Sequence, residues 1–274
     1  MMRSFIGFGL LFLTVLPGRA QGPAPTDQRQ YKDSINGCAP ASVLNLLKFS
    51  DPDSGYGAVY SSLLGSDEGV KMRYLVDRYC KGRASQTYPG QKRWGLHGID
   101  CRDLVLGLNE LLAESGLAPL TGTYLDRLAG ESGAAHLVRC RELIHRSIEG
   151  GVMPILSLRS FVVRHREDNN GDPVWETGVH HYVLVTGLHD SGSPFGLDLE
   201  IIDPWQGRRT RIHLHREANG QPFRALRGVE ESGVWLDGTP FLQVLAPEVG
   251  SLRPKDLEWS ERFVVVANFI IAAP

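Results

Sequence analysis

The chain has 274 residues, and its 29 Lys and Arg side chains nearly balance 31 Asp and Glu, for a formal net charge of −2. Neither sign forms a long block, which argues against nucleic acid or an anionic membrane as the partner. The length suits one large domain with a substantial core, so we expect recognition at a local site rather than through overall charge.

Residues 1–20 have the features of a secretory signal peptide. Arg3 precedes an apolar run from Phe5 to Leu16, and small residues occupy the positions around a cleavage point near Ala20. The run is too short for a comfortable bilayer span, and no basic stop-transfer cluster follows it. We therefore predict a secreted or periplasmic protein without a membrane anchor.

Residues 21–29 are rich in polar groups and proline, which predicts an extended lead-in to a single domain over residues 30–274. Apolar residues at helical spacing then predict four helices in the first half of the chain. These are a helix from Cys38 or Ala39 to Leu47, and helices over Val70–Tyr79, Asp103–Leu112 and Leu137–Ile148.

The second half of the chain changes character after Gly150 and Gly151, where β-branched and apolar runs predict strands. Helices followed by strands indicate an α+β domain. The predicted strands are Val152–Leu158, Val179–Leu188, Leu197–Ile202, Thr210–Leu214, Val234–Leu236 and Phe263–Ile271.

Cys38 is the first candidate for chemistry, because it stands where the first predicted helix begins, with Pro40 in the first turn. A thiol is a useful nucleophile only as the thiolate. A helix N-terminus and a neighbouring imidazolium both favour that negative charge. The sequence therefore predicts an activated cysteine if a histidine lies nearby.

Two adjacent histidines, His180 and His181, lie in a predicted strand, so their side chains face opposite ways and only one can meet Cys38. Periodicity alone does not choose between them. Asp203 ends a later apolar run just before Pro204, where a carboxylate can accept an imidazole N–H and fix the ring. The order Cys, His, Asp is the layout of a cysteine hydrolase.

The other three cysteines leave alternatives open. If Cys38 stays free, Cys80, Cys101 and Cys140 form at most one disulfide, and their spacing does not say which, although Cys80 with Cys101 closes the shortest loop. The alternative is that all three are small buried apolar side chains.

Neither candidate for a metal site has enough ligands. Asp168-Asn169-Asn170-Gly171-Asp172 reads as a hairpin turn, because the spacing of a calcium loop is not met. His213 and His215 share a strand face, but two ligands do not make a site. We predict no metal and no cofactor.

Three short stretches together resemble a known family. They are Gln30 with the segment Gly37-Cys38-Ala39-Pro40-Ala41-Ser42, then His181-Tyr182-Val183-Leu184-Val185-Thr186-Gly187, then Ile202-Asp203-Pro204 with Gly207. This pattern resembles the papain-like cysteine peptidases, and within them the bacteriocin-leader (double-glycine) peptidase-like group with its secreted stand-alone relatives. Ala39 departs from that pattern, since many relatives have Gly there.

The resemblance implies a papain-like fold, with the N-terminal helical part packed on a C-terminal antiparallel sheet. It makes Cys38 the nucleophile, His181 the general base and acid, Asp203 the orienting residue and Gln30 a donor to the oxyanion, with Gln28 as a competing donor. Double-glycine leader peptidases are typically fused to a transporter and work inside the cell. The features of export here therefore argue against leader processing.

The expected function is that of a secreted cysteine peptidase that hydrolyses a peptide or amide bond through a Cys38 acyl-enzyme, with a peptide or protein substrate. One alternative is transglutaminase-like transfer of the acyl group to an amine. The other is a catalytically silent module that only binds peptide or cell-wall material. The sequence does not indicate an oligomeric state or a cleavage specificity.

Overall fold

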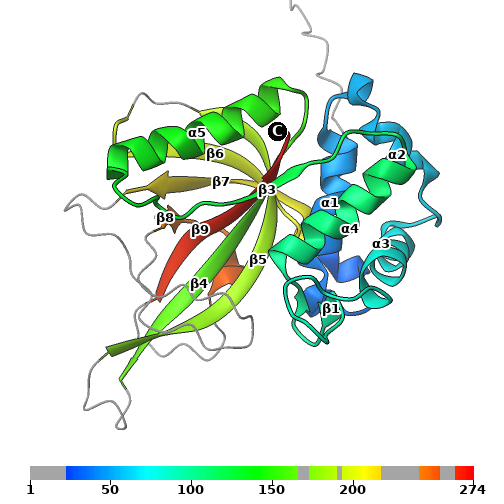
Figure 1. Ribbon diagram of the computed structural model, residues 1–274, viewed down its shortest axis with the longest axis horizontal. Helices are drawn as coiled ribbons and strands as arrows, with labels where there is room; N and C mark the ends of the chain where they lie inside the picture. Colours follow the sequence, from blue (N-terminus) through cyan, green and yellow to red (C-terminus); the bar gives the residue numbers. More distant parts are fainter. Residues whose placement is uncertain (1–22, 166–172, 190–192, 217–240, 254–262) are drawn as a thin grey trace, which may run out of the picture.

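The computed structural model describes residues 23–165, 173–189, 193–216, 241–253 and 263–274. Its helices gather on one side of a twisted sheet, and one long helix crosses the sheet's other part (Figure 1). The helices are α1 (Cys38–Phe49), α2 (Tyr56–Ser62), α3 (Glu68–Val76), α4 (Cys101–Glu114) and α5 (Gly133–Glu149), with short turns η1 (Gln28–Gln30) and η6 (Trp205–Gly207) that bear on the site.

Side-chain caps explain where three of these helices begin. Asp67 accepts the backbone N–H of Val70 at the start of α3, Asp100 caps α4 through Arg102 N, and Ser132 caps α5 through Ala135 N. Helix α1 begins differently, because its N-cap is Gly37, which offers no side-chain acceptor. The free N–H groups of its first turn are therefore available to other partners.

The sheet consists of seven strands in the order β3-β9-β4-β5-β6-β7-β8 among the described residues. A hairpin of β1 (Trp94–Gly95) and β2 (Gly98–Ile99) lies apart from it. The strands are β3 (Thr121–Tyr124), β4 (Ile155–His165), β5 (Pro173–His189), β6 (Gly196–Asp203), β7 (Arg208–His215), β8 (Leu242–Leu245) and β9 (Phe263–Ala272).

The predicted fold class, a papain-like α+β fold with the helical part packed on an antiparallel sheet, is wrong. Strand β8 pairs with β7 on one side and with β9 on the other, through Leu242↔Ala267 and Gln243↔Val266. Six of the described strands thus close into an antiparallel barrel, accompanied by five α-helices. Hydrophobic periodicity shows which face of a strand is buried, but it does not show which strands become neighbours.

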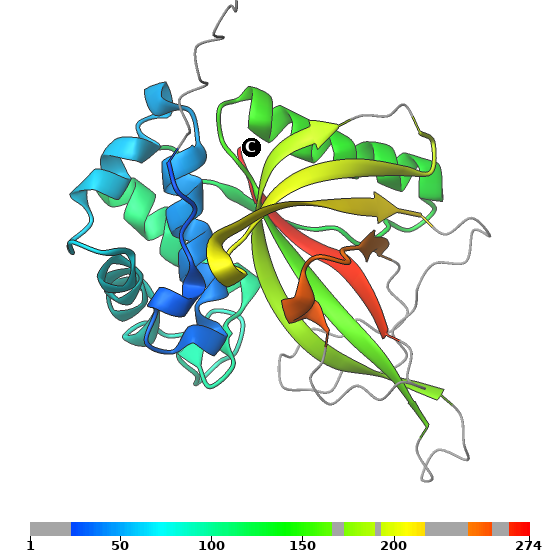
Figure 2. The same ribbon diagram turned by 180° about the vertical axis from the view of Figure 1, so that it is seen from behind.

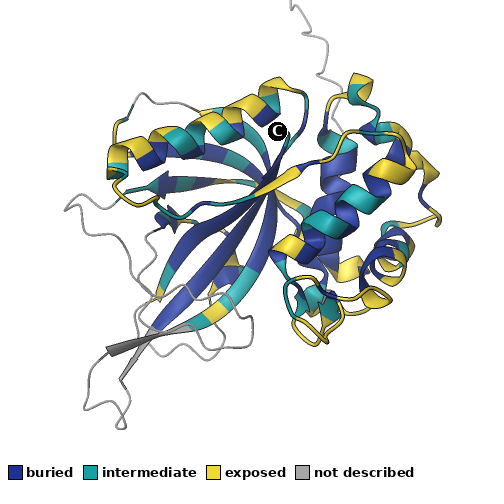
Figure 3. Ribbon diagram, in the orientation of Figure 1, coloured by how far each residue is buried: buried dark blue, intermediate teal, exposed yellow. Residues whose placement is uncertain are grey.

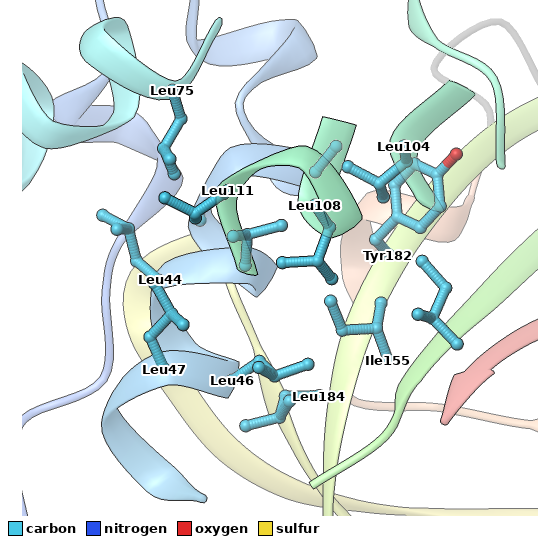
Figure 4. Packing of buried hydrophobic residues seen from close by; sticks show 14 of the residues in the cluster. Leu44, Leu46, Leu47, Leu75, Leu104, Leu108, Leu111, Ile155, Tyr182 and Leu184 are labelled. Atoms are coloured by element: carbon cyan, nitrogen blue, oxygen red, sulfur yellow. The ribbon is translucent and has the colours of Figure 1, made fainter. Parts of the chain in front are cut away.

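Alternate residues of β5 belong to two different cores. Val183 and Val185 point into the barrel, where they pack with other buried aliphatic side chains. Tyr182 and Leu184 point outward and pack against α1 and α4, together with Leu44 and Leu108 (Figure 4). The strands are accordingly buried along most of their length (Figure 3), and β5 is the strand that joins the barrel to the helices.

The segment ahead of α1 is more closely packed than an extended lead-in. Thr26 is buried and its backbone N–H donates to Asn45 Oδ1 of α1 at 2.7 Å, while Gln28 N donates to Pro204 O at 2.8 Å. Figure 2 shows this segment running along α1 beside the turn between β6 and β7. This segment thus holds the start of the chain's described part against α1 and against the corner that follows Asp203.

Several local predictions differ from the structure or lie beyond its described part. Helix α2 and strands β3 and β8 were not anticipated, because they are short and their apolar pattern is weak. The predicted signal peptide, the turn over residues 168–172 and the strand at residues 234–236 lie largely or wholly outside the described residues. Within those residues, no helix is long and apolar enough to cross a membrane.

Candidate active site

Cys38 is the first residue of α1, and its thiol is buried, with the residue 7% exposed. Its backbone N–H belongs to the first turn, which has no intrahelical acceptors, and the positive end of the helix dipole lies at the sulfur. Gly37 contributes no competing side-chain cap. The local sequence thus places a thiol where negative charge is stabilised.

His181 and Asp203 complete a chain of polar groups that starts at Cys38. His181 on β5 is 3% exposed and Asp203 at the end of β6 is 2% exposed. The imidazole Nε2 lies 2.7 Å from Asp203 Oδ1, which also accepts the backbone N–H of Trp205 at 2.9 Å. Since Nε2 is engaged by the carboxylate, Nδ1 is the nitrogen left for the Cys38 side chain, whose interaction with the ring favours the protonated form of His181.

The electrostatics of His181 favour its protonated form. Burial works against the charged ring, but hydrogen bonds to Asp203 and Cys38 and their negative charges outweigh it, which raises the pKa of His181 to about 9. An imidazolium is therefore the stable form beside the thiol at neutral pH. This is the arrangement that stabilises a thiolate.

Strand pairing accounts for the meeting of His181 with Asp203. The register pairs Leu184 with Ile202, so the last residue of β6 lies within three residues of His181 along β5. Pro204 ends the strand, and its carbonyl is held by Gln28 N. The carboxylate therefore turns toward the imidazole at the end of the strand rather than continuing along the sheet.

One hydrogen bond joins the helix that carries the thiol to the strand that carries the imidazole. Ser42 Oγ, one turn after Cys38, donates to the backbone carbonyl of Tyr182 at 3.0 Å, and the bond is buried. Tyr182 directly follows His181 in the chain. The bond therefore limits movement of α1 against β5 at the point where the two functional groups meet.

The structure settles which histidine faces Cys38. His180 lies on the other face of β5, where its Nε2 is 2.7 Å from Ser157 Oγ and 3.5 Å from Cys101 Sγ. Burial, and then the charges of Arg159 and His181, hold the pKa of His180 well below its ordinary value. His181 is thus the histidine of the candidate site, and His180 belongs to a separate cluster.

The structure does not bring Gln30 into this arrangement. Gln30 is exposed, and its side chain makes no hydrogen bond with any described residue, whereas Gln28 is buried beside the corner after Asp203. The backbone of Gln30 is held instead at α3, where its carbonyl oxygen packs against Gly69. The role of Gln30 as a donor to the oxyanion stays a prediction, and the competing residue Gln28 is the one that lies in the buried layer.

The remaining thiols are buried and free. Cys80, Cys101 and Cys140 form no disulfide in the described structure. Burial raises the pKa of Cys80 and of Cys140 to about 12, and that of Cys101 to about 11. In the described structure, Cys80, Cys101 and Cys140 are therefore small buried side chains and not a disulfide pair.

The described residues contain no group of three or more His, Cys, Asp or Glu side chains suited to a metal ion. The two histidines on β7 have other partners, because His213 Nδ1 bonds Asp198 Oδ1 at 2.7 Å and the His213 ring stacks on His215.

Comparisons with family models, curated proteins and solved structures found no match to this chain. The geometry of the site is therefore the basis for assigning a function.

Proposed function

We propose that the chain is a cysteine hydrolase that cleaves a peptide or amide bond through an acyl-enzyme on Cys38. The observation that carries the proposal is the buried chain from the Cys38 thiol through the His181 imidazole to the Asp203 carboxylate, with 2.7 Å between the last two groups. Each member occupies the place that nucleophilic catalysis requires.

In the first half of the reaction, the Cys38 sulfur attacks the carbonyl carbon while its proton resides on His181. The C–S bond forms, and the negative charge moves to the carbonyl oxygen. The backbone N–H groups of Cys38 and Ala39 in the first turn of α1 stabilise that charge, since Pro40 has no N–H and Ala41 N donates to Gly37 O. The imidazolium then gives its proton to the amine as the C–N bond breaks.

In the second half, His181 takes a proton from water, whose oxygen attacks the acyl carbon. The C–S bond breaks, and the carboxylic acid leaves with the thiol restored. Asp203 stays ionised throughout and holds the ring so that Nδ1 faces the sulfur. If an amine took the place of water, the same residues would transfer the acyl group instead.

The test is alkylation of the purified protein with an iodoacetamide probe between pH 5 and pH 9, with mass spectrometry to locate the label. We expect Cys38 to react fast at mildly acidic pH in the wild type and at least about tenfold more slowly in His181→Ala. Cys101 in the same molecule is the internal control, because burial raises its pKa to about 11.

Equal, slow labelling of Cys38 in the wild type and in His181→Ala would contradict the proposal and favour a binding module without catalysis. Where labelling is fast, a peptide pool incubated with and without a primary amine separates hydrolysis from acyl transfer. Hydrolysis yields free carboxylates in both samples. Amine-capped products in the second sample would instead identify a transferase.

A further inference from the structure

Arg159 on β4 is a buried cation that the proposed mechanism does not use. It is 6% exposed, its Nε is buried without a hydrogen-bond partner, and its guanidinium makes no hydrogen bond or ion pair with any described residue. Arg93 is buried to the same 6%, but it donates to Glu110 Oε1 at 2.8 Å and to the carbonyl of Tyr79 at 3.1 Å. Burying a charge without a counter-ion is unfavourable, so Arg159 stands out.

The described polar side chains that share the strand face of Arg159 on β4, β5 and β9 are neutral. Arg159 pairs with His180 across β4 and β5, so both side chains lie on the outer face of the sheet. His180 Nε2 contacts Ser157 Oγ, which in turn donates to Asn268 Oδ1 at 2.8 Å. The pKa of His180 is held low by burial and by Arg159, so among the described members of this cluster the guanidinium is the fixed positive charge.

This cluster lies next to the candidate active site. Leu158, the neighbour of Arg159, pairs with His181, and His180 pairs with Arg159 itself. Steps of about 3.8 Å along a strand and about 5 Å between strands place the Cα atoms of Arg159 and His181 within about 7 Å. An extended substrate advances about 3.3 Å per residue, so its first residues beyond the reacting bond can reach Arg159.

One edge of β5 has no described strand partner at this point. Strand β6 pairs with β5 between Leu184 and His189, so at His180 and His181 the only described strand neighbour is β4. Successive side chains of an extended peptide point in opposite directions. A peptide whose carbonyl faces His181 therefore directs its neighbouring substituent toward the face of His180 and Arg159.

We infer that Arg159 binds a carboxylate of the substrate, carried by an acidic side chain or by the C-terminus of a peptide, within about two residues of the reacting bond. The inference rests on the proposed function, since it names the substrate class of that site. A carboxylate supplies the counter-ion that the described residues do not offer, and it matches the planar guanidinium through two parallel hydrogen bonds.

The test uses matched pools of acetylated hexapeptides that are random except at one position. One pair of pools carries Asp or Asn at a fixed interior position with amidated ends, and a second pair carries a free or an amidated C-terminus. We expect the wild type to cleave one carboxylate pool about 10- to 100-fold more efficiently than its amide partner. The pair that shows the preference identifies the source of the carboxylate.

Variants at Arg159 then assign the preference. Arg159→Gln should lower kcat/KM for the preferred carboxylate pool about 10- to 100-fold, and Arg159→Lys should retain part of the preference because it keeps the charge but not the planar fork. Arg93→Gln is the matched control, equally buried but already paired, and should keep the preference. Similar cleavage of carboxylate and amide pools by the wild type would overturn the inference.

Thermal unfolding separates a binding role from a structural one. Arg159→Gln should melt at or above the wild-type temperature, because it removes an unpaired buried charge, whereas Arg93→Gln should melt lower. A comparable decrease in both variants would give Arg159 a structural partner and overturn the inference.

Binding measured without catalysis distinguishes the two proposals. In Cys38→Ala, carboxylate peptides but not their amides should shift the NMR signals of the His180 imidazole, and Arg159→Gln should abolish the shift. If the carboxylate peptides bind but the wild type does not cleave them, the hydrolase proposal is wrong and the Arg159 site stands. If the wild type cleaves peptides without any carboxylate preference, the Arg159 site is wrong and the hydrolase proposal stands. If the peptides are neither bound nor cleaved, both proposals are wrong.

Discussion

Two cysteine–histidine pairs lie side by side along β5, and each cysteine is the first residue of a helix, Cys38 of α1 and Cys101 of α4. The histidines, His181 and His180, are neighbours in the chain. The pKa of His181 is raised to about 9, whereas that of His180 is held well below its ordinary value. A helix N-terminus and a nearby imidazole are therefore common to both pairs and do not explain the difference.

The difference lies in the group behind each ring. Asp203 accepts from His181 Nε2 and stabilises the imidazolium, whereas His180 contacts the neutral Ser157 hydroxyl and lies near the cationic Arg159. Burial opposes protonation in both cases, so the carboxylate, supported by the Cys38 thiol, decides the outcome. The same two residue types thus form an activated pair at one site and an inert pair at the other.

The largest expected effect comes from removing that carboxylate. Asp203→Asn should lower the rate of Cys38 alkylation at pH 6 about 10- to 100-fold, because the ring loses the charge that favours its protonated form. Asp198→Asn is the matched control, since Asp198 bonds His213 at the same 2.7 Å in a more exposed pair. An unchanged rate in Asp203→Asn would remove the distinction between the two cysteine–histidine pairs.

The two histidines should also titrate in opposite directions from an ordinary imidazole. A raised folded-state pKa means that His181 contributes stability fully below about pH 6.5, which is lost as the pH rises through about 9. His180, with a lowered folded-state pKa, contributes stability above about pH 6.5 that is lost as the pH falls further.

NMR titration of the imidazole signals between pH 5 and pH 10 measures both directly. His181→Gln and His180→Gln assign the signals, and denaturant unfolding of each variant gives the matching change in stability. Two signals that titrate together near pH 6.5 would show that Asp203 and Arg159 do not separate the rings.

Sequence reasoning located these residues because each ends a local pattern. Cys38 begins helix α1, and Asp203 is the last residue of strand β6, just before Pro204. It could not choose between His180 and His181, because that choice depends on where the first turn of α1 lies beside β5. It also missed the closure of the sheet, since the contact between β8 and β9 joins residues more than 20 positions apart through a strand of four residues.

The choice between the two candidate oxyanion donors also depends on contacts that the sequence does not show. Gln28 and Gln30 are two residues apart, and no pattern in the sequence distinguishes them. Their difference comes from Pro204, whose carbonyl accepts Gln28 N, and from Gly69, against which the Gln30 carbonyl packs. Likewise, the lack of a partner for Arg159 among the described residues emerges only from the contacts of the folded chain.

The smallest expected effect tests how each cysteine is held against β5, where Tyr182 serves both pairs. Its carbonyl accepts from Ser42 of α1 at 3.0 Å, while its hydroxyl lies 3.0 Å from the Ile99 carbonyl and 3.4 Å from Cys101 Sγ. Ser42→Ala should therefore loosen Cys38 against His181, and Tyr182→Phe should loosen only the Cys101 side. Each loses about 1 kcal/mol of stability, typical of one buried hydrogen bond.

The alkylation rate of Cys38 discriminates between positioning and simple support. If the bond from Ser42 holds Cys38 in line with His181, losing its contribution of about 1 kcal/mol should lower the alkylation rate about fivefold in Ser42→Ala. Tyr182→Phe should leave that rate within about twofold of the wild type. Ser61→Ala controls for loss of a helix hydroxyl, because Ser61 bonds Gly57 O on the surface of α2. If Ser42→Ala loses stability while Cys38 reacts as before, the bond supports α1 without aligning it. The geometry of the Cys38–His181 pair would then depend on the hydrogen bond between His181 and Asp203 alone.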